Sequence, residues 1–225
     1  MINSDERRID FYFDYISHNA YLVWHLLPDL ANKYGYELRA IPVLFAGFLK
    51  EYGQLGPAEV APKLDWMNRN NLRKARLLGI PFNPPKLHPF NPLLLLRLSA
   101  QEMPESQRST LTGCLLRGVW VDSLDPNDSD AVGTYLNNNG IDAAPLIAGA
   151  SNAQAKEQLR ENCDTAVARG SFGVPTMIVG NDVFWGYDDL TYLETLLAGK
   201  DPLAESDIAG YLEGWEVARA AAQHR

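Results

Sequence analysis

The chain has 225 residues, of which 46% are hydrophobic, and it carries a formal net charge of -8 at pH 7. This length and composition allow a large buried core and argue against global disorder. The negative charge, without any run of lysine or arginine, argues against a surface for nucleic acid or anionic membranes.

The N-terminus and the cysteines bear on where the protein works. Residues 1–8 carry charges with no apolar stretch behind them and are not read as a signal peptide, and no apolar run reaches membrane-spanning length. Cys114 and Cys163 are far apart and form no Cys-x-x-Cys pair. We therefore expect a reduced, cytoplasmic protein. The cysteines and the four histidines show no paired metal-ligand spacing, so no metal site is expected.

The first predicted unit is a strand, a helix and a second strand. Aromatic residues 11–13 favour a strand, and the apolar residues that follow recur at three- and four-residue spacing, as in an amphipathic helix. Pro28 should kink this helix and Gly35 should end it. Residues 36–44 alternate like a second strand, which should pair in parallel with the first.

The middle of the chain is predicted to be helical, without strands. Glycines and Pro57 in residues 46–57 indicate a loop or lid, and residues 62–77 indicate a helix that ends at Gly79. Residues 81–92 hold five prolines and should be irregular. Further helices are expected at residues 93–100, 107–122, 129–138 and 153–168.

Strands return late in the sequence. Residues 174–179 and 183–185 favour two antiparallel strands around a tight turn at residues 180–182. Asp188 and Asp189 begin a helix, and a last helix is expected over residues 206–222.

The order of these elements predicts an α/β protein. A β-α-β unit, a helical insertion and a β-β-α unit together make the thioredoxin-like architecture with an all-helical domain inserted between its halves. We expect residues 1–46 and 165–225 to form the thioredoxin-like domain, and residues 47–164 to form the inserted domain.

Ser17 lies where the first strand turns into the first helix. The first N–H groups of a helix lack internal partners, and the helix dipole places partial positive charge there, so a hydroxyl at this position can help to stabilise an anion. The alternative is that Ser17 is only an N-cap. On its position alone, that is the simpler interpretation.

Several separated motifs resemble one known family. They lie in residues 11–17 (FYFDYIS), 56–57 with 62–66, 79–81, 172–177 (FGVPTM) and 185–190 (WGYDDL). In this order they resemble the 2-hydroxychromene-2-carboxylate isomerases and the kappa-class glutathione transferases, relatives of the bacterial disulfide oxidoreductase DsbA. The likeness spans nearly the whole chain and both halves of the fold.

The resemblance implies that Ser17 is the catalytic residue and that glutathione is the cofactor. Disulfide exchange needs a thiolate and usually a second cysteine, but the helix here begins Ser17, His18, Asn19, Ala20, which excludes dithiol chemistry at this position. A free thiol with a pKa of about 8.5 is mostly protonated near neutral pH. A serine can donate a hydrogen bond to the glutathione sulfur and so favour its anion. We expect Ser17 to activate that sulfur and not to act as a nucleophile.

The resemblance also implies the rest of the glutathione site. Val174, before a cis Pro175, would offer its backbone N–H and C=O to the cysteinyl part of glutathione. Lys63, from the inserted domain, would pair with a carboxylate of glutathione or of the substrate. The γ-glutamyl part would be held by Trp185, Gly186, Tyr187 and Asp188, with a helix start for the carboxylate and the Asp188 carboxylate for the ammonium group.

These residues also have simpler interpretations. Val174 and Pro175 would look the same in a purely structural proline turn. Asp188 and Asp189 are typical helix caps, and on their spacing alone capping is the simpler interpretation. Most lysines are solvated, so the role of Lys63 depends on the motif match.

Four residues are expected to line the acceptor-substrate site: His18, Asn19, His88 and Asn91. His18 and Asn19 depart from the family pattern, in which proline and usually an aromatic residue follow the serine. Tyr187 stands where asparagine is common. These departures flank the sulfur and the γ-glutamyl pocket, so they leave the identity of the acceptor open.

The leading hypothesis is a glutathione-dependent isomerase that acts on an aromatic hydroxy-acid. As the resemblance implies, the thiolate would add to a conjugated carbon, the ring would open, a bond would rotate, and elimination would return the thiol. The alternatives are a kappa-like glutathione transferase with another acceptor and a non-catalytic thioredoxin-fold binding module. A disulfide oxidoreductase has the least support, and the family implies a homodimer.

Overall fold

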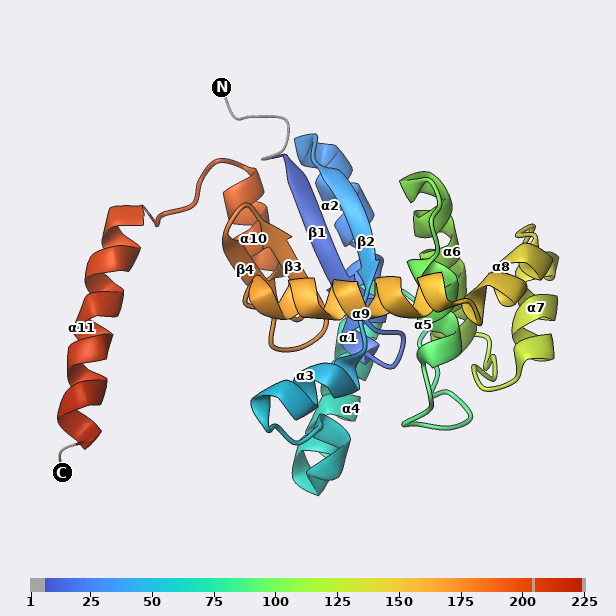
Figure 1. The fold of residues 1–225 in the computed structure, drawn as a ribbon. Helices are drawn as coiled ribbons and strands as arrows, with labels where there is room; N and C mark the ends of the chain where they lie inside the picture. Colours follow the sequence, from blue (N-terminus) through green and yellow to red (C-terminus); the bar gives the residue numbers. More distant parts are fainter. Residues whose placement is uncertain (1–6, 204, 224–225) are drawn as a thin grey trace. The chain divides into compact units, whose positions relative to one another are not determined.

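A four-stranded mixed sheet organises the structure, a computed structural model that describes residues 7–203 and 205–223 (Figure 1). The strand order is β2-β1-β3-β4. The strands are β1 (Arg8–Phe13), β2 (Glu37–Pro42), β3 (Thr176–Val179) and β4 (Asp182–Trp185). Phe11 of β1 lies opposite Ala40 in the parallel pairing with β2 and opposite Met177 in the antiparallel pairing with β3. The predicted β-α-β and β-β-α arrangement of a thioredoxin-like fold is confirmed.

Helices fill the chain between β2 and β3, as predicted, and also follow β1 and β4 in the sequence. In chain order they are α1 (His18–Trp24), α2 (Leu27–Tyr34), α3 (Phe45–Tyr52), the short 3-10 helix η2 (Pro57–Glu59), α4 (Ala61–Leu78), α5 (Leu93–Ala100), α6 (Glu105–Trp120), α7 (Ser129–Asn138), α8 (Ala143–Ala150), α9 (Ala153–Ala168), α10 (Leu190–Leu197) and α11 (Glu205–Gln223). No helix of the described residues is long and apolar enough to cross a membrane.

The chain divides into two compact units at Leu190, and the second unit begins at Thr191. The first unit contains the whole sheet and the helices through α9. The boundaries expected for the inserted domain, at residues 47 and 164, lie inside this first unit and remain a prediction.

Proline and glycine set the helix boundaries in the first unit. The sequence predicted one helix kinked at Pro28, but the structure has two: α1 ends at Trp24 and α2 begins at Leu27. Pro28 lies in the first turn of α2, where a missing N–H breaks no helical bond. Gly35 and Gly79 end α2 and α4 in the left-handed conformation, with φ of 70° and 67°.

Two predictions about the insertion were wrong. The segment expected to be a loop or lid forms helix α3, because Phe48 is buried in a cluster with Tyr12 and Val43, and this burial outweighs the cost of Gly47 in the helix. Helix α8 was not predicted at all. Its alanines give little periodic signal, and it begins at Asp142, whose side chain accepts a hydrogen bond from the Ala144 N–H at 3.3 Å.

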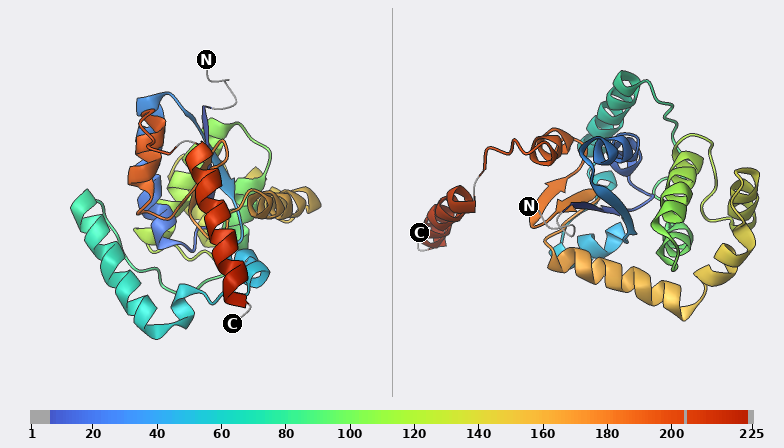
Figure 2. Two further views of the ribbon diagram at one scale, coloured as in Figure 1. Left: turned by 90° about the vertical axis from the view of Figure 1, so that its left-hand side faces the viewer. Right: turned by 90° about the horizontal axis from the view of Figure 1, so that it is seen from above.

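The two faces of β1 pack against different helices. Side chains alternate along a strand, so Phe11 points to one face and Tyr12 to the other. Phe11 contacts Trp24 of α1, with ring centroids 5.7 Å apart, while Tyr12 packs against Ala166 of α9. Figure 2 shows α1 and α2 on one side of the strands and α9 on the opposite side. A short turn, residues 14–17, connects the C-terminal end of β1 to the start of α1.

Candidate active site

Ser17 holds together two segments that are far apart in the sequence. It is the N-cap of α1, and its Oγ accepts a hydrogen bond from the Ala20 N–H at 3.2 Å. The same hydroxyl donates to the Val174 carbonyl oxygen at 3.4 Å. Ser17 is therefore a helix cap and also a contact to the segment before β3, so the capping interpretation does not account for all of its interactions.

The segment around Val174 is packed tightly against the hairpin. The Val174–Pro175 peptide bond is cis, as the resemblance implied. The Pro175 carbonyl accepts a hydrogen bond from the Gly186 N–H at 2.9 Å. Gly173 lies so close to Trp185 that a Cβ there would be 2.7 Å from the indole Nε1. The structure thus joins Val174 to Ser17, and Pro175 to Gly186, the first residue after β4.

Two neighbouring aspartates in the turn after β4 have different partners. Asp189 accepts a hydrogen bond from the Trp185 N–H at 2.7 Å. Asp188 instead forms an ion pair with Lys74 of α4, with Nζ and Oδ1 2.9 Å apart. The Lys74 ammonium also lies 4.5 Å from the centroid of the Tyr187 ring. Of the two aspartates, Asp189 bonds back to the end of β4, while Asp188 faces a cation.

Lys74 is a site residue that the sequence reasoning missed. It is 8% exposed, whereas Lys63, the lysine that was expected, is exposed near the start of α4. The two lysines are separated by roughly 16 Å along the helix axis, at about 1.5 Å per residue. The signal was available: Lys74 lies beside Asn71 and Ala75 on the buried face of α4, where a lysine is out of place.

His18 and His88, two of the expected substrate residues, lie together in an aromatic cluster. The His18 ring centroid is 4.9 Å from that of His88 and 4.4 Å from that of Trp120. Burial, and to a lesser extent the nearby His88, lowers the pKa of His18 to about 3, so its imidazole is neutral at physiological pH.

The same cluster fixes the backbone that leads into Ser17. Trp120 Nε1 donates a hydrogen bond to the Tyr15 carbonyl at 3.0 Å, and His88 Nε2 lies 3.0 Å from the Ile16 carbonyl oxygen, as a donor in the matching tautomer. These contacts hold the two residues before Ser17, which gives the serine a defined orientation.

The other two expected substrate residues have different surroundings. Asn91 is exposed, and its Oδ1 accepts a hydrogen bond from the Leu93 N–H at 3.0 Å, at the start of α5. Asn19 is partly buried on α1, and its Oδ1 has no hydrogen-bond partner among the described residues. The buried Nδ2 of Asn71, on the neighbouring helix α4, also lacks one. Unpaired buried groups of this kind are costly, so they suit a site that binds a polar ligand.

Asp14, which was not predicted as a site residue, fixes the backbone next to Ser17. Its fully buried carboxylate accepts hydrogen bonds from the Phe45 N–H at 2.8 Å and the Ile16 N–H at 3.1 Å. It therefore connects the turn that carries Ser17 to the start of α3. Burial raises the pKa of Asp14 to about 7.

The chain supplies no thiolate of its own to this site. Cys163 lies on α9, where its Sγ accepts a hydrogen bond from the Leu44 N–H at 3.2 Å, and Cys114 lies on α6. Burial raises the pKa of both thiols, so both are protonated near neutral pH. Among the described residues, no group of three or more histidine, cysteine, aspartate or glutamate side chains is placed to hold a metal ion.

Known proteins resemble the chain along most of its length. Residues 8–198 match the DSBA-like thioredoxin domain. A 2-hydroxychromene-2-carboxylate isomerase from Sphingobium xenophagum is 30% identical over 193 residues, which cover 85% of this chain and 98% of the relative. A kappa 1 glutathione S-transferase from Rattus norvegicus is 24% identical over 86% of this chain and 92% of its own. The solved structure of a 2-hydroxychromene-2-carboxylate isomerase is 28% identical, superposes with a TM-score of 0.78, and covers 85% of this chain and 94% of its own.

Proposed function

We propose, since the chain belongs to the family of DSBA-like thioredoxin domains and has isomerases and glutathione transferases as relatives, that it is a glutathione-dependent isomerase. Its substrate would be an aromatic hydroxy-acid of the 2-hydroxychromene-2-carboxylate type, as named for the relatives. The observation that carries the proposal is the position of the Ser17 hydroxyl, between the start of α1 and the Val174 carbonyl.

Ser17 and the start of α1 would stabilise a sulfur anion. When bound, glutathione supplies a thiol whose sulfur can add reversibly to a conjugated carbon and so free a double bond to rotate. The hydrogen bond from the Ser17 hydroxyl to the Val174 carbonyl is long, at 3.4 Å. The hydroxyl can therefore turn and donate to that sulfur instead. The unpaired N–H groups of the first helical turn add positive potential in the same direction.

The residues around Ser17 fit the rest of glutathione. Lys74 provides a buried cation for a carboxylate, and the Asp188 side chain, which is 76% exposed, can receive an ammonium group on its free side. The unpaired Oδ1 of Asn19 and Nδ2 of Asn71 would gain partners from a polar ligand. Roles for Lys63 and Asn91 also remain proposals, since both side chains are exposed at some distance from these contacts.

Neutral His18 and the rings around it would orient an aromatic substrate. An imidazole with a pKa of about 3 stays uncharged, so it leaves the sulfur anion to the serine and does not pair with it as an imidazolium. Because Trp120 and His88 hold the backbone of Tyr15 and Ile16, the serine needs little reorganisation during the reaction.

The experiment compares two substitutions at Ser17. Ser17→Ala removes both the hydroxyl donor and the helix cap, and should cost about 1 kcal/mol of stability. Ser17→Asp keeps an acceptor for the Ala20 N–H, so it keeps the helix cap, but when ionised it has no proton to donate to sulfur or to the Val174 carbonyl. We expect both variants to lower glutathione-dependent turnover of 2-hydroxychromene-2-carboxylate by about a hundredfold or more, the scale seen when one donor to a developing anion is lost.

Calorimetric titration with reduced glutathione provides the second readout. The wild type should bind glutathione and release protons, and both Ser17 variants should lose that release. Ser106→Ala, at an exposed position of α6, is the matched control and should leave binding and turnover unchanged. Full turnover by Ser17→Asp would show that the hydroxyl does not activate the thiol.

A glutathione transferase is the second candidate, favoured by the kappa-class relative and by His18 in the place where the family has proline. The two activities differ in their balance of thiol. An isomerase returns all glutathione at the end of the reaction, whereas a transferase consumes one glutathione for each product. A conjugate that accumulates as thiol disappears would assign transfer and reject isomerisation.

A further inference from the structure

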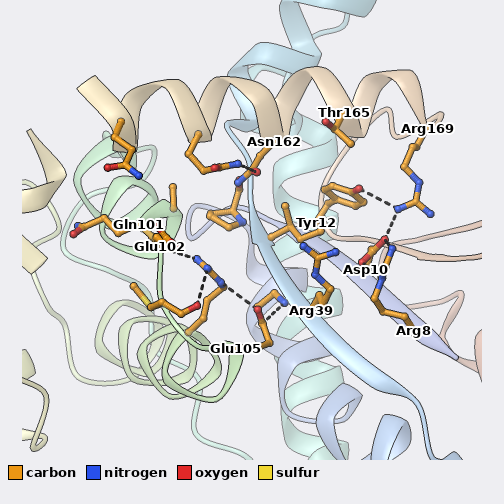
Figure 3. Close-up of a pocket in the computed structure, with 18 residues that line it drawn as sticks. Arg8, Asp10, Tyr12, Arg39, Gln101, Glu102, Glu105, Asn162, Thr165 and Arg169 are labelled. Atoms are coloured by element: carbon orange, nitrogen blue, oxygen red, sulfur yellow. Dashed lines mark hydrogen bonds and ion pairs between the residues drawn. The ribbon is translucent and has the colours of Figure 1, made fainter. Parts of the chain in front are cut away.

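A cavity lies on the side of the sheet away from α1, and it shares no residue with the site around Ser17. It has a volume of about 690 Å³, and its walls come from β1, β2, the connection between α5 and α6, and α9. Figure 3 shows α9 running along one side of it and the strands along the other. This volume lies within the range of small-molecule sites in proteins.

The wall contributed by α9 is polar, although it faces a sheet. Residues at three- and four-residue spacing on this helix line the cavity: Gln154, Gln158, Asn162, Thr165 and Arg169. A separate apolar stripe, Ala155, Leu159 and Ala166, is buried and anchors the helix. A helix that only needed to cover a sheet would present one apolar face to it. Within the polar stripe, Asn162 donates to the Pro42 carbonyl at 3.0 Å and Arg169 pairs with Asp10, so these two also hold the helix on the sheet. The exposed Gln154, Gln158 and Thr165 line the cavity without such a contact to the strands.

The strand side of the cavity carries an excess of positive charge. Asp10 is 2% exposed and pairs with both Arg8, at 3.0 Å, and Arg169. Its single negative charge is therefore shared by two guanidinium groups, and Figure 3 shows both of them reaching toward it. Each guanidinium has about five N–H donors, and one carboxylate cannot use them all.

Arg39 adds a further guanidinium, which acts on Glu105 and Tyr12 electrostatically. It lines the same cavity, is exposed to solvent, and forms no hydrogen bond or ion pair with any described residue. The remaining arginine of the lining, Arg108, is paired with Glu105 at 3.2 Å and also donates to backbone carbonyls. Even with exposed Glu102 counted, four guanidinium groups face three carboxylates in a chain whose net charge is -8. A locally positive cavity in an acidic protein selects for anions.

We propose that this cavity is a second binding site, for a small organic anion whose carboxylate or phosphate group is held by Arg39 together with Arg8. Guanidinium groups bind both kinds of oxyanion through paired N–H donors. The polar side chains of Gln154, Gln158 and Thr165 then contact the hydroxyl or amide groups of the ligand. The site is separate from the proposed thiol chemistry, and it does not depend on whether that proposal holds.

The test is calorimetric titration of the full chain with two probes, pyrophosphate and succinate, at constant ionic strength. We expect one-to-one saturable binding of at least one probe at millimolar concentration or below. Arg39→Gln should weaken it about tenfold or more, because a charge-assisted contact is lost. Arg76→Gln, which removes the same charge from an exposed position of α4 outside the cavity, should leave the affinity unchanged.

A second variant tests the cavity without changing its charge. Gln158→Trp places a bulky side chain at an exposed position of α9 that lines the cavity, so it should block binding while the chain stays folded. Tighter binding of pyrophosphate would assign a phosphate-bearing ligand, and tighter binding of succinate a carboxylate. The proposal is overturned if neither probe saturates, if Arg76→Gln weakens binding as much as Arg39→Gln, or if Gln158→Trp binds like the wild type.

Discussion

His18 and Asp14 are buried titratable residues on either side of Ser17 in the sequence, and their pKa values shift in opposite senses. Burial lowers the pKa of His18 to about 3 and raises the pKa of Asp14 to about 7. Both shifts favour the neutral form, because charge is costly in a low-dielectric interior. The immediate surroundings of the serine are therefore kept uncharged near neutral pH by the side chains that precede and follow it, apart from the fraction of Asp14 that ionises there.

We predict that His18 makes the protein less stable in acid. Its folded-state pKa of about 3 lies below the unfolded value of 6.5, so the unfolded chain binds one more proton between these pH values. The contribution of His18 is fully present above pH 6.5 and is lost as the pH falls toward 3, by up to about 1.4 kcal/mol per pH unit. His18→Phe, which keeps a ring against Trp120, should remove this dependence. Urea unfolding at several pH values measures it.

Asp14 must be separated from this effect, because it acts with the opposite sign. Its folded-state pKa of about 7 lies above its ordinary value of 3.8, so its contribution to stability is lost as the pH rises toward 7. The difference between the wild type and His18→Phe cancels the Asp14 contribution. Equal pH slopes for the two proteins would mean that His18 is already protonated in the folded state.

Single residues of the site were predictable where a local motif defines them. Ser17, Val174 and Pro175 were expected to meet, and the structure places them in contact. Lys74 and Asp14 were not expected, because their roles depend on tertiary contacts. Lys74 matters only because α4 docks beside the turn after β4, and Asp14 only because α3 begins above it.

At the scale of elements, helix α6 depends on a close approach that only glycine allows. A Cβ at Gly118 would lie 2.9 Å from Leu124 Cδ2 and 2.9 Å from Tyr135 Cε1, on the neighbouring helix α7. Such distances are too short for ordinary contacts, so either the ring or α6 would have to move. The sequence around residue 118 gives no hint of this approach, because a helical glycine looks the same whether or not a neighbour presses on it.

We predict that two glycine-to-alanine substitutions have opposite effects. Gly118→Ala should destabilise the protein by about 1–3 kcal/mol, because the added methyl group overpacks the contact with α7. Gly47→Ala, in α3, meets no atom within 4 Å and should stabilise by about 0.5–1 kcal/mol, because alanine favours a helix. Urea denaturation of both variants measures these values. Similar changes in the two variants would contradict the packing argument.

Most element boundaries followed from punctuation in the sequence. Gly35 and Gly79 ended helices where expected, and the proline-rich residues 81–92 are irregular as expected. Helix α3 was missed because its glycines mimic a loop, although the burial of Phe48 decides its conformation. The break between α1 and α2 shows the same limit, since a proline fixes where a helix starts but not whether the preceding one continues.

For the whole molecule, the order of strands and helices was enough to predict the fold, but not the cavity between the strands and α9. A β-α-β unit and a β-β-α unit have few compatible arrangements, so the mixed sheet followed from the sequence. The cavity arises where the polar stripe of α9 faces alternate residues of β1. Each stripe is visible in the sequence, but nothing in it says that they face one another.

We predict that reduced glutathione stabilises the whole chain against heat. A ligand at about 100 times its Kd adds about 2.7 kcal/mol, which for a chain of 225 residues raises Tm by roughly 5–10 °C. Differential scanning calorimetry measures the shift. Ser17→Asp should show a smaller one, because it lacks the donor to sulfur. An absent shift in the wild type would count against a glutathione site.

The strand order also determines when the sheet and the contact of Ser17 can be completed during synthesis. Strand β1 lies between β2 and β3, so one of its edges has no partner until Thr176 to Val179 have been made. At about 5–20 residues per second, the ribosome needs roughly ten to thirty seconds to pass from β1 to β3. During that time β1 has an unpaired hydrogen-bonding edge, and the Ser17 hydroxyl lacks its acceptor, the Val174 carbonyl. The contact between Ser17 and Val174 can therefore form only late in synthesis, after the whole helical segment between β2 and β3 has been made.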